Sequence, residues 1–230
     1  MPVRKVYGRQ EADGQGALGY QLFLPIDYEA EPEKRWPVIL FLHGIKKRGS
    51  NLGDLDGYGL LGIAEETPGF GFVVIVPQCP AESSWPKERA SVLALLDSVQ
   101  QHYRTDAKQV LLTGFSMGGN GVWDLADYAS DRFAAAAPLA GYYDADRASL
   151  FGDMPIWTFH GEADDVVPVQ RTQDVVAALQ LAGKNVRCTL LPELKHPIMD
   201  AVYRDPALFE WFLEQVKPEC SSHRPEGHSE

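Results

Sequence analysis

The sequence has few cysteines, little positive charge and no long apolar run, and each shortage excludes a class of protein. Its three cysteines, Cys79, Cys188 and Cys220, form no Cys-x-x-Cys pair, so neither a disulfide scaffold nor a zinc site is predicted. The 21 lysines and arginines are outnumbered by 32 aspartates and glutamates. A formal net charge of −11 disfavours nucleic acid and anionic membranes as partners, because both would be repelled.

The longest apolar runs, residues 38–42, 70–76 and 134–140, fall far short of the about 20 residues that a transmembrane helix needs. No apolar segment follows the N-terminal Met-Pro-Val-Arg-Lys, so no secretory signal is indicated. We therefore expect a cytoplasmic protein without a membrane partner, unless a leader has been removed from the chain.

The length and composition indicate one domain. A chain of 230 residues that is 45% hydrophobic can bury a full core, and open α/β folds of this size often stay undivided. We expect residues 1–217 to form this domain. Residues 218–230 show no apolar periodicity and are predicted to be a mobile C-terminal tail.

Short apolar runs alternate with segments of helical periodicity along the chain. Residues 36–42 and 72–77 are apolar at nearly every position, as strands buried on both faces must be. Residues 18–24 alternate apolar with less apolar side chains and are predicted to be an edge strand. Further strands are predicted at 110–113, 133–139, 155–159 and 186–191, and helices at 89–103, 170–182 and 208–216. The order predicts an α/β fold with a doubly wound, mostly parallel sheet that binds ligands at the carboxyl ends of its strands.

A motif near the middle of the chain, Gly114-Phe115-Ser116-Met117-Gly118, separates a strand-like run from a segment of helical periodicity. A serine at such a turn is held in strained dihedral angles that expose its hydroxyl, and the glycines let neighbouring elements approach closely. The pattern arises by chance in roughly one chain in ten of this length. Ser116 is therefore a candidate nucleophile that needs a base, an acid and an oxyanion hole elsewhere in the chain.

The base that a serine nucleophile needs is usually a histidine. The chain has six: His43, His102, His160, His196, His223 and His228. Two belong to the polar tail, and His102 lies on a predicted helix at the amino edge of the sheet. His43 and His160 each end a strand before a glycine, where an imidazole bonded to backbone is the commoner arrangement. His196 follows the strand at 186–191 in a short loop at the carboxyl edge, which favours it as the base over an ordinary surface histidine.

Two adjacent carboxylates, Asp164 and Asp165, follow the strand at 155–159 and also reach the carboxyl edge. A carboxylate that accepts the Nδ1 hydrogen of His196 would orient the ring so that Nε2 can take the serine proton. We favour Asp164 for this role, with Asp165 capping the loop or the next helix. The resulting order of serine, aspartate and histidine is that of the α/β-hydrolase triad.

Two backbone N–H groups are candidates for the oxyanion hole. Ile45 lies in the loop after the strand at 36–42, and Met117 directly follows the serine, so both N–H groups can point at one oxygen. Gly44 suits a tight turn close to substrate, although a glycine that merely ends the strand is the alternative.

Residues from about 20 to 216 resemble serine esterases of the α/β-hydrolase superfamily. Within it they are similar to small carboxylesterases and "predicted peptidases" related to polyhydroxyalkanoate depolymerases and to feruloyl and acetylxylan esterases. The resemblance rests on four motifs: Phe41-Leu42-His43-Gly44 with Arg48-Gly49, Pro77-Gln78-Cys79-Pro80 with Trp85, Gly114-Phe115-Ser116-Met117-Gly118-Gly119, and Trp157-x-Phe159-His160-Gly161-x-x-Asp164-Asp165-x-Val167-Pro168. It implies a triad and an oxyanion hole, and no metal or cofactor. The implied roles are Ser116 as nucleophile, Asp164 as acid, His196 as base, and the N–H groups of Ile45 and Met117 as the hole.

The chain departs from this family beside the histidine, where Lys195 and Met199 replace the usual glycine and aromatic residue. Only residues 142–154 separate two of the predicted strands at the point where a cap would be inserted, so no cap domain fits. We expect an open site for short acyl esters or for esters displayed on a larger molecule. Four residues are predicted to line it: Trp85, Tyr142, Tyr143 and Met199.

Two of these assignments have an ordinary alternative. Tyr142 and Tyr143 can equally be packing residues. The basic run Lys46-Lys47-Arg48 also departs from the family, which usually has a glycine-acidic pair there. It is expected to be a solvated loop, and attraction of carboxylate-bearing substrates is the alternative.

The sequence therefore predicts a serine carboxylesterase that forms an acyl-enzyme and acts on a small or polymer-linked ester. Its rate should fall with decreasing pH, because a protonated His196 cannot accept the serine proton. A peptidase or amidase of the same fold is the first alternative, and a non-catalytic binding protein of this fold is the second. The natural ester and the oligomeric state are not indicated.

Overall fold

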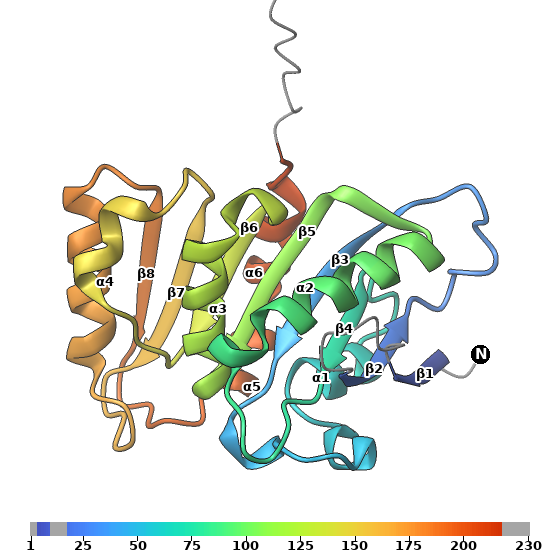
Figure 1. Ribbon diagram of the computed structural model, residues 1–230, viewed down its shortest axis with the longest axis horizontal. Coiled ribbons are helices and arrows are strands. Elements are labelled where there is room, and N and C mark those ends of the chain that lie inside the picture. Colours follow the sequence, from blue (N-terminus) through green and yellow to red (C-terminus); the bar gives the residue numbers. More distant parts are fainter. Residues whose placement is uncertain (1–3, 10–17, 218–230) are drawn as a thin grey trace, which may run out of the picture.

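A computed structural model of the chain describes residues 4–9 and 18–217 (Figure 1). The predicted tail, residues 218–230, lies outside the described residues. The strands are β1 (Arg4–Arg9), β2 (Gly19–Leu24), β3 (Trp36–Leu42), β4 (Val73–Pro77), β5 (Thr105–Phe115), β6 (Ala135–Leu139), β7 (Ile156–Gly161) and β8 (Val186–Leu191). The α-helices are α1 (Leu60–Glu66), α2 (Trp85–His102), α3 (Met117–Tyr128), α4 (Val169–Leu181), α5 (Met199–Tyr203) and α6 (Pro206–Glu214). Short 3-10 helices are η1 (Ile45–Lys47), η2 (Leu52–Leu55), η3 (Ser130–Arg132) and η4 (Ala145–Leu150).

The eight strands form one sheet in the order β1-β2-β4-β3-β5-β6-β7-β8. Neighbouring strands from β4 across to β8 are parallel, whereas β2 is antiparallel to both β1 and β4. The predicted doubly wound, mostly parallel sheet is confirmed. The carboxyl ends of the parallel strands lie along the lower edge of the sheet in Figure 1.

The prediction that residues 18–24 form an edge strand is wrong. β2 lies between β1 and β4, and its last four residues are buried. The misleading polar position is Gln21, whose buried side-chain N–H groups donate to the Leu52 carbonyl (2.6 Å) and to Asp56 (2.9 Å). The edge is β1, whose sequence has too few apolar residues to indicate a strand.

Both faces of the sheet are covered, and the strands alternate between two hydrophobic cores. Along β3, Val38, Leu40 and Leu42 pack into one core, and Ile39 and Phe41 pack into the other. The first core is closed by α2, α3 and α4 and the second by α1, α5 and α6 (Figure 1). Burial of each large aliphatic side chain stabilises the fold by about 1.5–3 kcal/mol, which explains why β3 and β4 contain no polar side chain.

Most predicted boundaries are close, but β5 begins at Thr105 instead of residue 110, one helix begins earlier than predicted, and two helices were not predicted. The helix expected from residue 89 begins at Trp85, with Pro86 in its first turn, where a missing N–H costs nothing. Helices α1 and α5 were not expected, because each is too short to show helical periodicity.

The connection between β6 and β7 holds only the 3-10 helix η4, which confirms that no cap domain is inserted there. None of the helices within residues 4–9 and 18–217 is long and apolar enough to span a bilayer.

Candidate active site

Ser116 occupies the turn between β5 and α3. Its backbone has φ 57° and ψ −118°, a region that non-glycine residues rarely adopt and that costs on the order of 1–3 kcal/mol. The Ser116 N–H donates to the Leu139 carbonyl of β6 at 2.9 Å, which holds the turn against the neighbouring strand. The strain predicted at this serine is confirmed.

Two glycines make the turn sterically possible. A β-carbon at Gly118 would lie 1.9 Å from the Leu42 carbonyl oxygen, and one at Gly114 would lie 2.7 Å from the same atom. Both clashes are with backbone, which cannot rotate away as a side chain can. The spacing of the motif therefore follows from close packing of α3 against the end of β3.

Three predicted residues from three separate loops form one hydrogen-bonded chain. His196 Nε2 lies 2.8 Å from Ser116 Oγ, and His196 Nδ1 lies 2.7 Å from Asp164 Oδ2. His196 comes from the loop after β8 and Asp164 from the loop after β7, so both reach the edge where α3 begins. When the Nδ1 hydrogen is donated to the carboxylate, Nε2 is free to accept the serine proton.

Asp164 is buried, and it is held as a carboxylate. Its Oδ1 accepts the N–H groups of Val166 and Val167, both at 2.8 Å. Burial would raise the pKa of Asp164, but the hydrogen bonds from His196 and the two backbone N–H groups outweigh it and hold the pKa below its ordinary value. Asp164 must be ionised at neutral pH to accept the Nδ1 hydrogen of His196 and so orient the imidazole ring.

The alternative acid, Asp165, points elsewhere. Its carboxylate lies 3.1 Å from Lys195 Nζ, and these two side chains are 55% and 68% exposed. An exposed ion pair of this kind contributes at most about 1 kcal/mol. The geometry therefore favours Asp164 as the partner of His196.

A second histidine lies behind the acid. His160 Nε2 is 3.1 Å from Asp164 Oδ2 and 2.9 Å from the Val167 carbonyl oxygen, and Nδ1 is 2.7 Å from Thr172 Oγ1. His160 is fully buried, so the ring cannot reach a substrate. The prediction of a histidine bonded to backbone is confirmed, while its contact with the acid was not foreseen, because residue spacing does not reveal it.

The two residues predicted for the oxyanion hole each begin a helix. Ile45 opens η1 and Met117 opens α3, so neither N–H has a carbonyl partner within its own helix. The two helices are adjacent because β3 pairs with β5. A β-carbon at Gly44 would lie 3.3 Å from the Tyr58 hydroxyl oxygen, which is a tight contact, and Gly44 itself is extended. The loop therefore requires the small size of glycine at position 44, and not the tight turn that the sequence predicted.

His43 is hydrogen-bonded to the loop that carries Gly44 and Ile45. Its Nδ1 donates to the Gly44 carbonyl at 2.8 Å, and its Nε2 accepts the Cys79 N–H at 3.0 Å. Burial is the main cause that lowers the pKa of His43 from 6.5 to about 4, and nearby cations lower it further. The neutral imidazole links the loop after β3 to the loop after β4, as expected of a histidine bonded to backbone.

The prediction that Trp85 lines the site is wrong. Its side chain is only 1% exposed. The indole N–H donates to the His43 carbonyl at 2.9 Å, and the two rings pack edge to face at 4.9 Å. Trp85 therefore supports the loop that carries His43 and Ile45 and is too buried to touch a substrate.

Two of the three basic residues of this loop form hydrogen bonds within the protein. Lys47 Nζ donates to the Asp54 carbonyl at 2.6 Å, and Arg48 donates to the Ser83 carbonyl at 2.9 Å. These contacts favour a structural role for the two cations over attraction of a charged substrate.

Tyr58 also lies against the loop that carries Gly44 and Ile45, and none of the sequence motifs contains it. A β-carbon at Gly44 would lie 3.3 Å from its hydroxyl oxygen, and its ring stacks on Phe41 with centroids 6.2 Å apart. Burial raises the pKa of Tyr58, and a hydrogen bond with the Gly44 backbone works against this rise. The hydroxyl is therefore neutral and touches the peptide next to Ile45.

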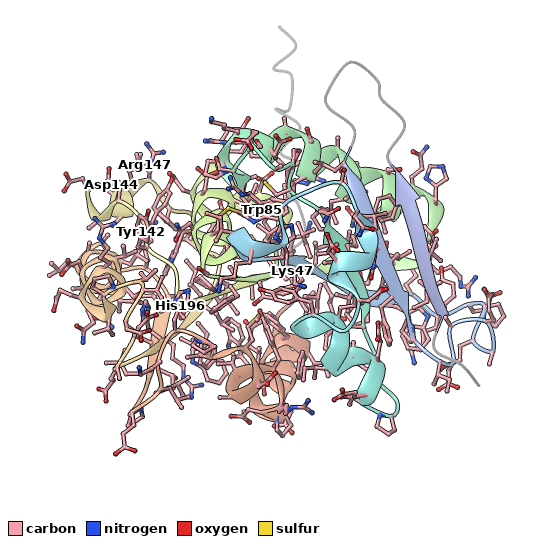
Figure 2. The ribbon with its side chains drawn as sticks, turned by 90° about the horizontal axis from the view of Figure 1, so that it is seen from below. Lys47, Trp85, Tyr142, Asp144, Arg147 and His196 are labelled. Atoms are coloured by element: carbon pink, nitrogen blue, oxygen red, sulfur yellow. The ribbon has the colours of Figure 1, made fainter. Side chains whose placement is uncertain are left out.

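Tyr142 and Tyr143 line a cavity of about 620 Å³. Tyr142 lies at the same edge of the sheet as His196 (Figure 2). Tyr142 is 38% exposed, while Tyr143 is half-buried and donates to Asp127 at 2.8 Å. None of Ser116, Asp164 and His196 is among the lining residues of this cavity, so the contact of the two tyrosines with substrate stays a prediction. Met199 is half-buried beside Gly59, and its predicted contact with substrate is likewise untested. Other lining residues are Asn120, Asp144, Arg147, Arg171 and Asp174.

Residues 80–202, more than half of the chain, match the dienelactone hydrolase family. The chain belongs to this family. The matched segment contains Ser116, Asp164 and His196 but not Ile45. Membership of the dienelactone hydrolase family confirms the resemblance to the α/β-hydrolase superfamily.

The dienelactone hydrolase match is accompanied by similarity to individual esterases. A bifunctional acetylxylan esterase/xylanase from Neocallimastix patriciarum is 30% identical over 144 residues, which are 60% of this chain and 20% of that protein. The chain thus spans about a fifth of the length of this curated relative. A thermostable esterase of known structure has a TM-score of 0.81 and 28% identity, over 92% of this chain and 63% of that one. A ferulic acid esterase with a TM-score of 0.70 and 16% identity, over 91% and 96% of the two chains, shares the fold.

Within the described part of this dienelactone hydrolase family protein, no group of three or more histidine, cysteine, aspartate or glutamate side chains is placed to hold a metal. Cys79 is buried and Cys188 half-buried, and both are free thiols, while Cys220 lies outside the described residues. Burial raises the pKa of Cys79 to about 12, so its thiol is not a competing nucleophile.

Proposed function

We propose that the protein is a serine carboxylesterase that works through an acyl-enzyme intermediate. The observation that carries this proposal is the chain from Ser116 Oγ to His196 (2.8 Å) and from His196 to Asp164 (2.7 Å), at a strained turn on the carboxyl edge of the sheet. Family membership and the similarity to an acetylxylan esterase and a thermostable esterase support it.

In the first half-reaction Ser116 Oγ attacks the carbonyl carbon of the ester while His196 Nε2 takes the hydroxyl proton. The carbonyl oxygen becomes negative and receives hydrogen bonds from the N–H groups of Ile45 and Met117. One such donor lowers the barrier by about 2.7–4 kcal/mol. Asp164 stabilises the imidazolium, which then gives its proton to the oxygen of the leaving alcohol.

In the second half-reaction water takes the place of the alcohol. His196 accepts a proton from the water, whose oxygen attacks the acyl carbon, and the same two N–H groups hold the new oxyanion. The bond to Ser116 Oγ breaks, the serine regains its proton from His196, and the carboxylic acid leaves.

The open edge of the sheet favours esters with a short acyl group, whether small or displayed on a polymer. Only η4 stands between β6 and β7, so no lid covers Ser116 from this connection. A lid is what shields long acyl chains from water, and without one a long chain would gain little by burial.

The test is the Ser116→Ala variant with p-nitrophenyl acetate as substrate. We expect turnover to fall by on the order of a thousandfold or more, because the acyl-enzyme cannot form. Ser98→Ala, which removes a hydroxyl on α2 away from the triad, should retain full activity. A fluorophosphonate probe followed by mass spectrometry should label Ser116 alone. Near-native turnover by Ser116→Ala would overturn the proposal.

A further inference from the structure

His160, on β7, is a fully buried histidine that the proposed reaction does not use. Its Nδ1 lies 2.7 Å from Thr172 Oγ1. Its Nε2 lies 2.9 Å from the Val167 carbonyl oxygen and 3.1 Å from Asp164 Oδ2. Polar atoms that are shielded from water are almost always hydrogen-bonded within the protein, so these contacts determine how many protons the ring carries.

The Nε2 atom of His160 carries a proton. The two oxygens beside it belong to a carbonyl group and to an ionised carboxylate, and both can only accept hydrogen bonds. A lone pair on Nε2 would face these oxygens and be repelled by both. The Nε2–H group therefore donates to the Val167 carbonyl, and the Asp164 carboxylate lies beside it.

The Nδ1 atom of His160 carries a proton as well. Thr172 Oγ1 contacts Nδ1 and also lies 2.6 Å from the Gly141 carbonyl oxygen. The carbonyl can only accept, and an O–O distance of this length is that of a hydrogen bond, so the single hydroxyl hydrogen is donated to Gly141. The hydroxyl oxygen then accepts a hydrogen bond from Nδ1. A neutral ring would leave one of these short contacts without a hydrogen, whereas an imidazolium fills all of them.

Asp164 compensates the charge of this buried imidazolium. A buried cation is costly unless a counter-ion and hydrogen bonds replace the lost water. The side chains of His160 and Asp164 are both 0% exposed, so water does not screen their attraction. The pair of Asp165 and Lys195 differs in this respect, because both of its side chains are more than half exposed.

The charged side chains of α4 nearest to Thr172 have other partners. The Arg171 guanidinium lies 4.5 Å from the centroid of the Tyr142 ring. Asp174 accepts the side-chain amide of Gln170 at 2.9 Å. The titratable group on which a charged His160 acts is therefore found across Asp164, in the loop after β8.

This group is His196, because the two histidines share one carboxylate oxygen. Asp164 Oδ2 lies 3.1 Å from His160 Nε2 and 2.7 Å from His196 Nδ1. A positive charge within about 4–6 Å of a second group opposes protonation of that group and moves its titration by about one pH unit or more. His196 thus stays neutral, and able to accept the serine proton, in more acidic solution than it would without His160.

We propose, on the basis of the esterase function proposed above, that His160 is a buried imidazolium at neutral pH and a positioning residue of the active site. Together with His196 it holds the Asp164 carboxylate, and its charge keeps His196 unprotonated in mildly acidic solution. His160 gives up neither proton during the reaction, and the serine proton passes through His196 alone.

The protonation of His160 is tested by NMR of the wild-type protein labelled with ¹⁵N at histidine. At neutral pH we expect both ring nitrogens of His160 to carry a hydrogen, whereas a neutral ring carries one. The signals that disappear in His160→Gln identify the residue. A single protonated ring nitrogen in the wild type overturns the proposal.

The action of His160 on the base is tested by two pH titrations. One follows the His196 ring by NMR, and the other follows kcat/KM for p-nitrophenyl acetate on the acidic side. His160→Gln keeps an N–H group that can donate to the Val167 carbonyl but removes the charge. We expect the midpoint of both titrations to lie about one pH unit or more higher in this variant. A purely structural role would lower the activity equally at every pH and leave both midpoints in place.

Thr172 provides a second pair of variants that retain the imidazole. Thr172→Val removes the oxygen that accepts the Nδ1 hydrogen, so His160 should lose that proton and both midpoints should again rise. Thr172→Ser keeps the hydroxyl and should titrate like the wild type. His102→Gln is the matched control, because His102 is exposed on α2 and its ring contacts the Ser98 carbonyl. It should leave both midpoints unchanged.

Midpoints that do not move in His160→Gln and Thr172→Val overturn the role assigned to His160. If far-UV circular dichroism shows that His160→Gln does not fold, the comparison of Thr172→Val with Thr172→Ser decides. Failure of the esterase function is a separate result, seen as no hydrolysis of p-nitrophenyl acetate by the wild type. The NMR titration of His196 requires no turnover, so in that event it still supports or overturns the inference.

Discussion

His43 and His196 both lie at the carboxyl edge of the sheet, and they differ in what their ring nitrogens contact. Both nitrogens of His43 bond to backbone, at Gly44 and Cys79, and the residue is fully buried. The nitrogens of His196 meet a carboxylate and a serine hydroxyl, and its side chain is 13% exposed.

The comparison shows that the hydrogen-bond partners of a histidine ring determine whether the histidine can act as a base. Peptide groups do not titrate near neutral pH, so His43 can only hold two loops together. A hydroxyl that loses its proton on attack, together with a carboxylate that stabilises the resulting cation, allows His196 to act as a base. The variants and measurements below distinguish the structural role of His43 from the proposed catalytic role of His196.

The largest effect is expected for His196→Ala. Loss of the base should lower kcat/KM for p-nitrophenyl acetate by on the order of 10³–10⁴, while far-UV circular dichroism remains native. Asp164 keeps the Val166 and Val167 N–H groups in this variant, so the loop stays anchored. A loss of less than tenfold would contradict the proposed role of His196.

The second effect is a dependence of stability on pH that belongs to His43. The pKa of His43 is lowered from 6.5 to about 4 in the folded protein, so between these values the unfolded chain binds a proton that the folded protein does not. The free energy of unfolding should therefore fall by about 3 kcal/mol as the pH decreases from 6.5 to 4. Urea unfolding at several pH values measures this loss. His43→Gln should flatten the dependence, and an unchanged slope in that variant would assign it to other groups.

A smaller effect is expected at the tryptophan that supports His43. Trp85→Phe leaves the His43 carbonyl without its indole donor and should cost about 1–2 kcal/mol of stability beyond the change in size. Trp123→Phe is the matched control, because Trp123 is also fully buried but its indole N–H has no hydrogen-bond partner among the described residues. Equal losses in denaturant unfolding of the two variants would show that the bond to His43 does not matter.

The smallest effect is expected for Tyr58→Phe. The hydroxyl contacts the Gly44 backbone and so positions the neighbouring N–H of Ile45 for the oxyanion. Its removal should lower kcat by about three- to tenfold with little change in KM, since the contact bears on the transition state. Tyr128→Phe serves as the control. A change confined to KM would point to contact with the substrate instead.

The sequence allowed the parallel sheet and the residues of the triad to be predicted with few alternatives. Apolar runs such as residues 36–42 indicate strands buried on both faces because few other structures hide every position. Ser116, Asp164 and His196 each follow such a run, and parallel strands bring their carboxyl ends to one edge. The prediction that failed concerned a single strand, at residues 18–24. Gln21 indicated that one face of this strand is exposed, although Gln21 is buried and donates hydrogen bonds to other residues.

The roles of side chains at the site could be predicted only where a motif stated them. Trp85 lies beside a family motif, but whether it faces substrate or the core depends on where α2 begins. His160 and Tyr58 contact the acid and the oxyanion loop through partners that are distant in sequence, and no spacing rule records such contacts.

By itself the sequence determined the order of strands and helices and the chemical types of the three candidate catalytic residues, because these follow from hydrophobic periodicity and from a motif with a steric reason. The sequence favoured Asp164 over Asp165 and His196 over His43, but only the tertiary structure showed the contacts that distinguish the members of each pair. The tertiary structure also decided that Trp85 supports a loop while Tyr142 lines a cavity. These choices depend on which groups meet across strands far apart in the chain, and that is settled when the sheet packs against its helices.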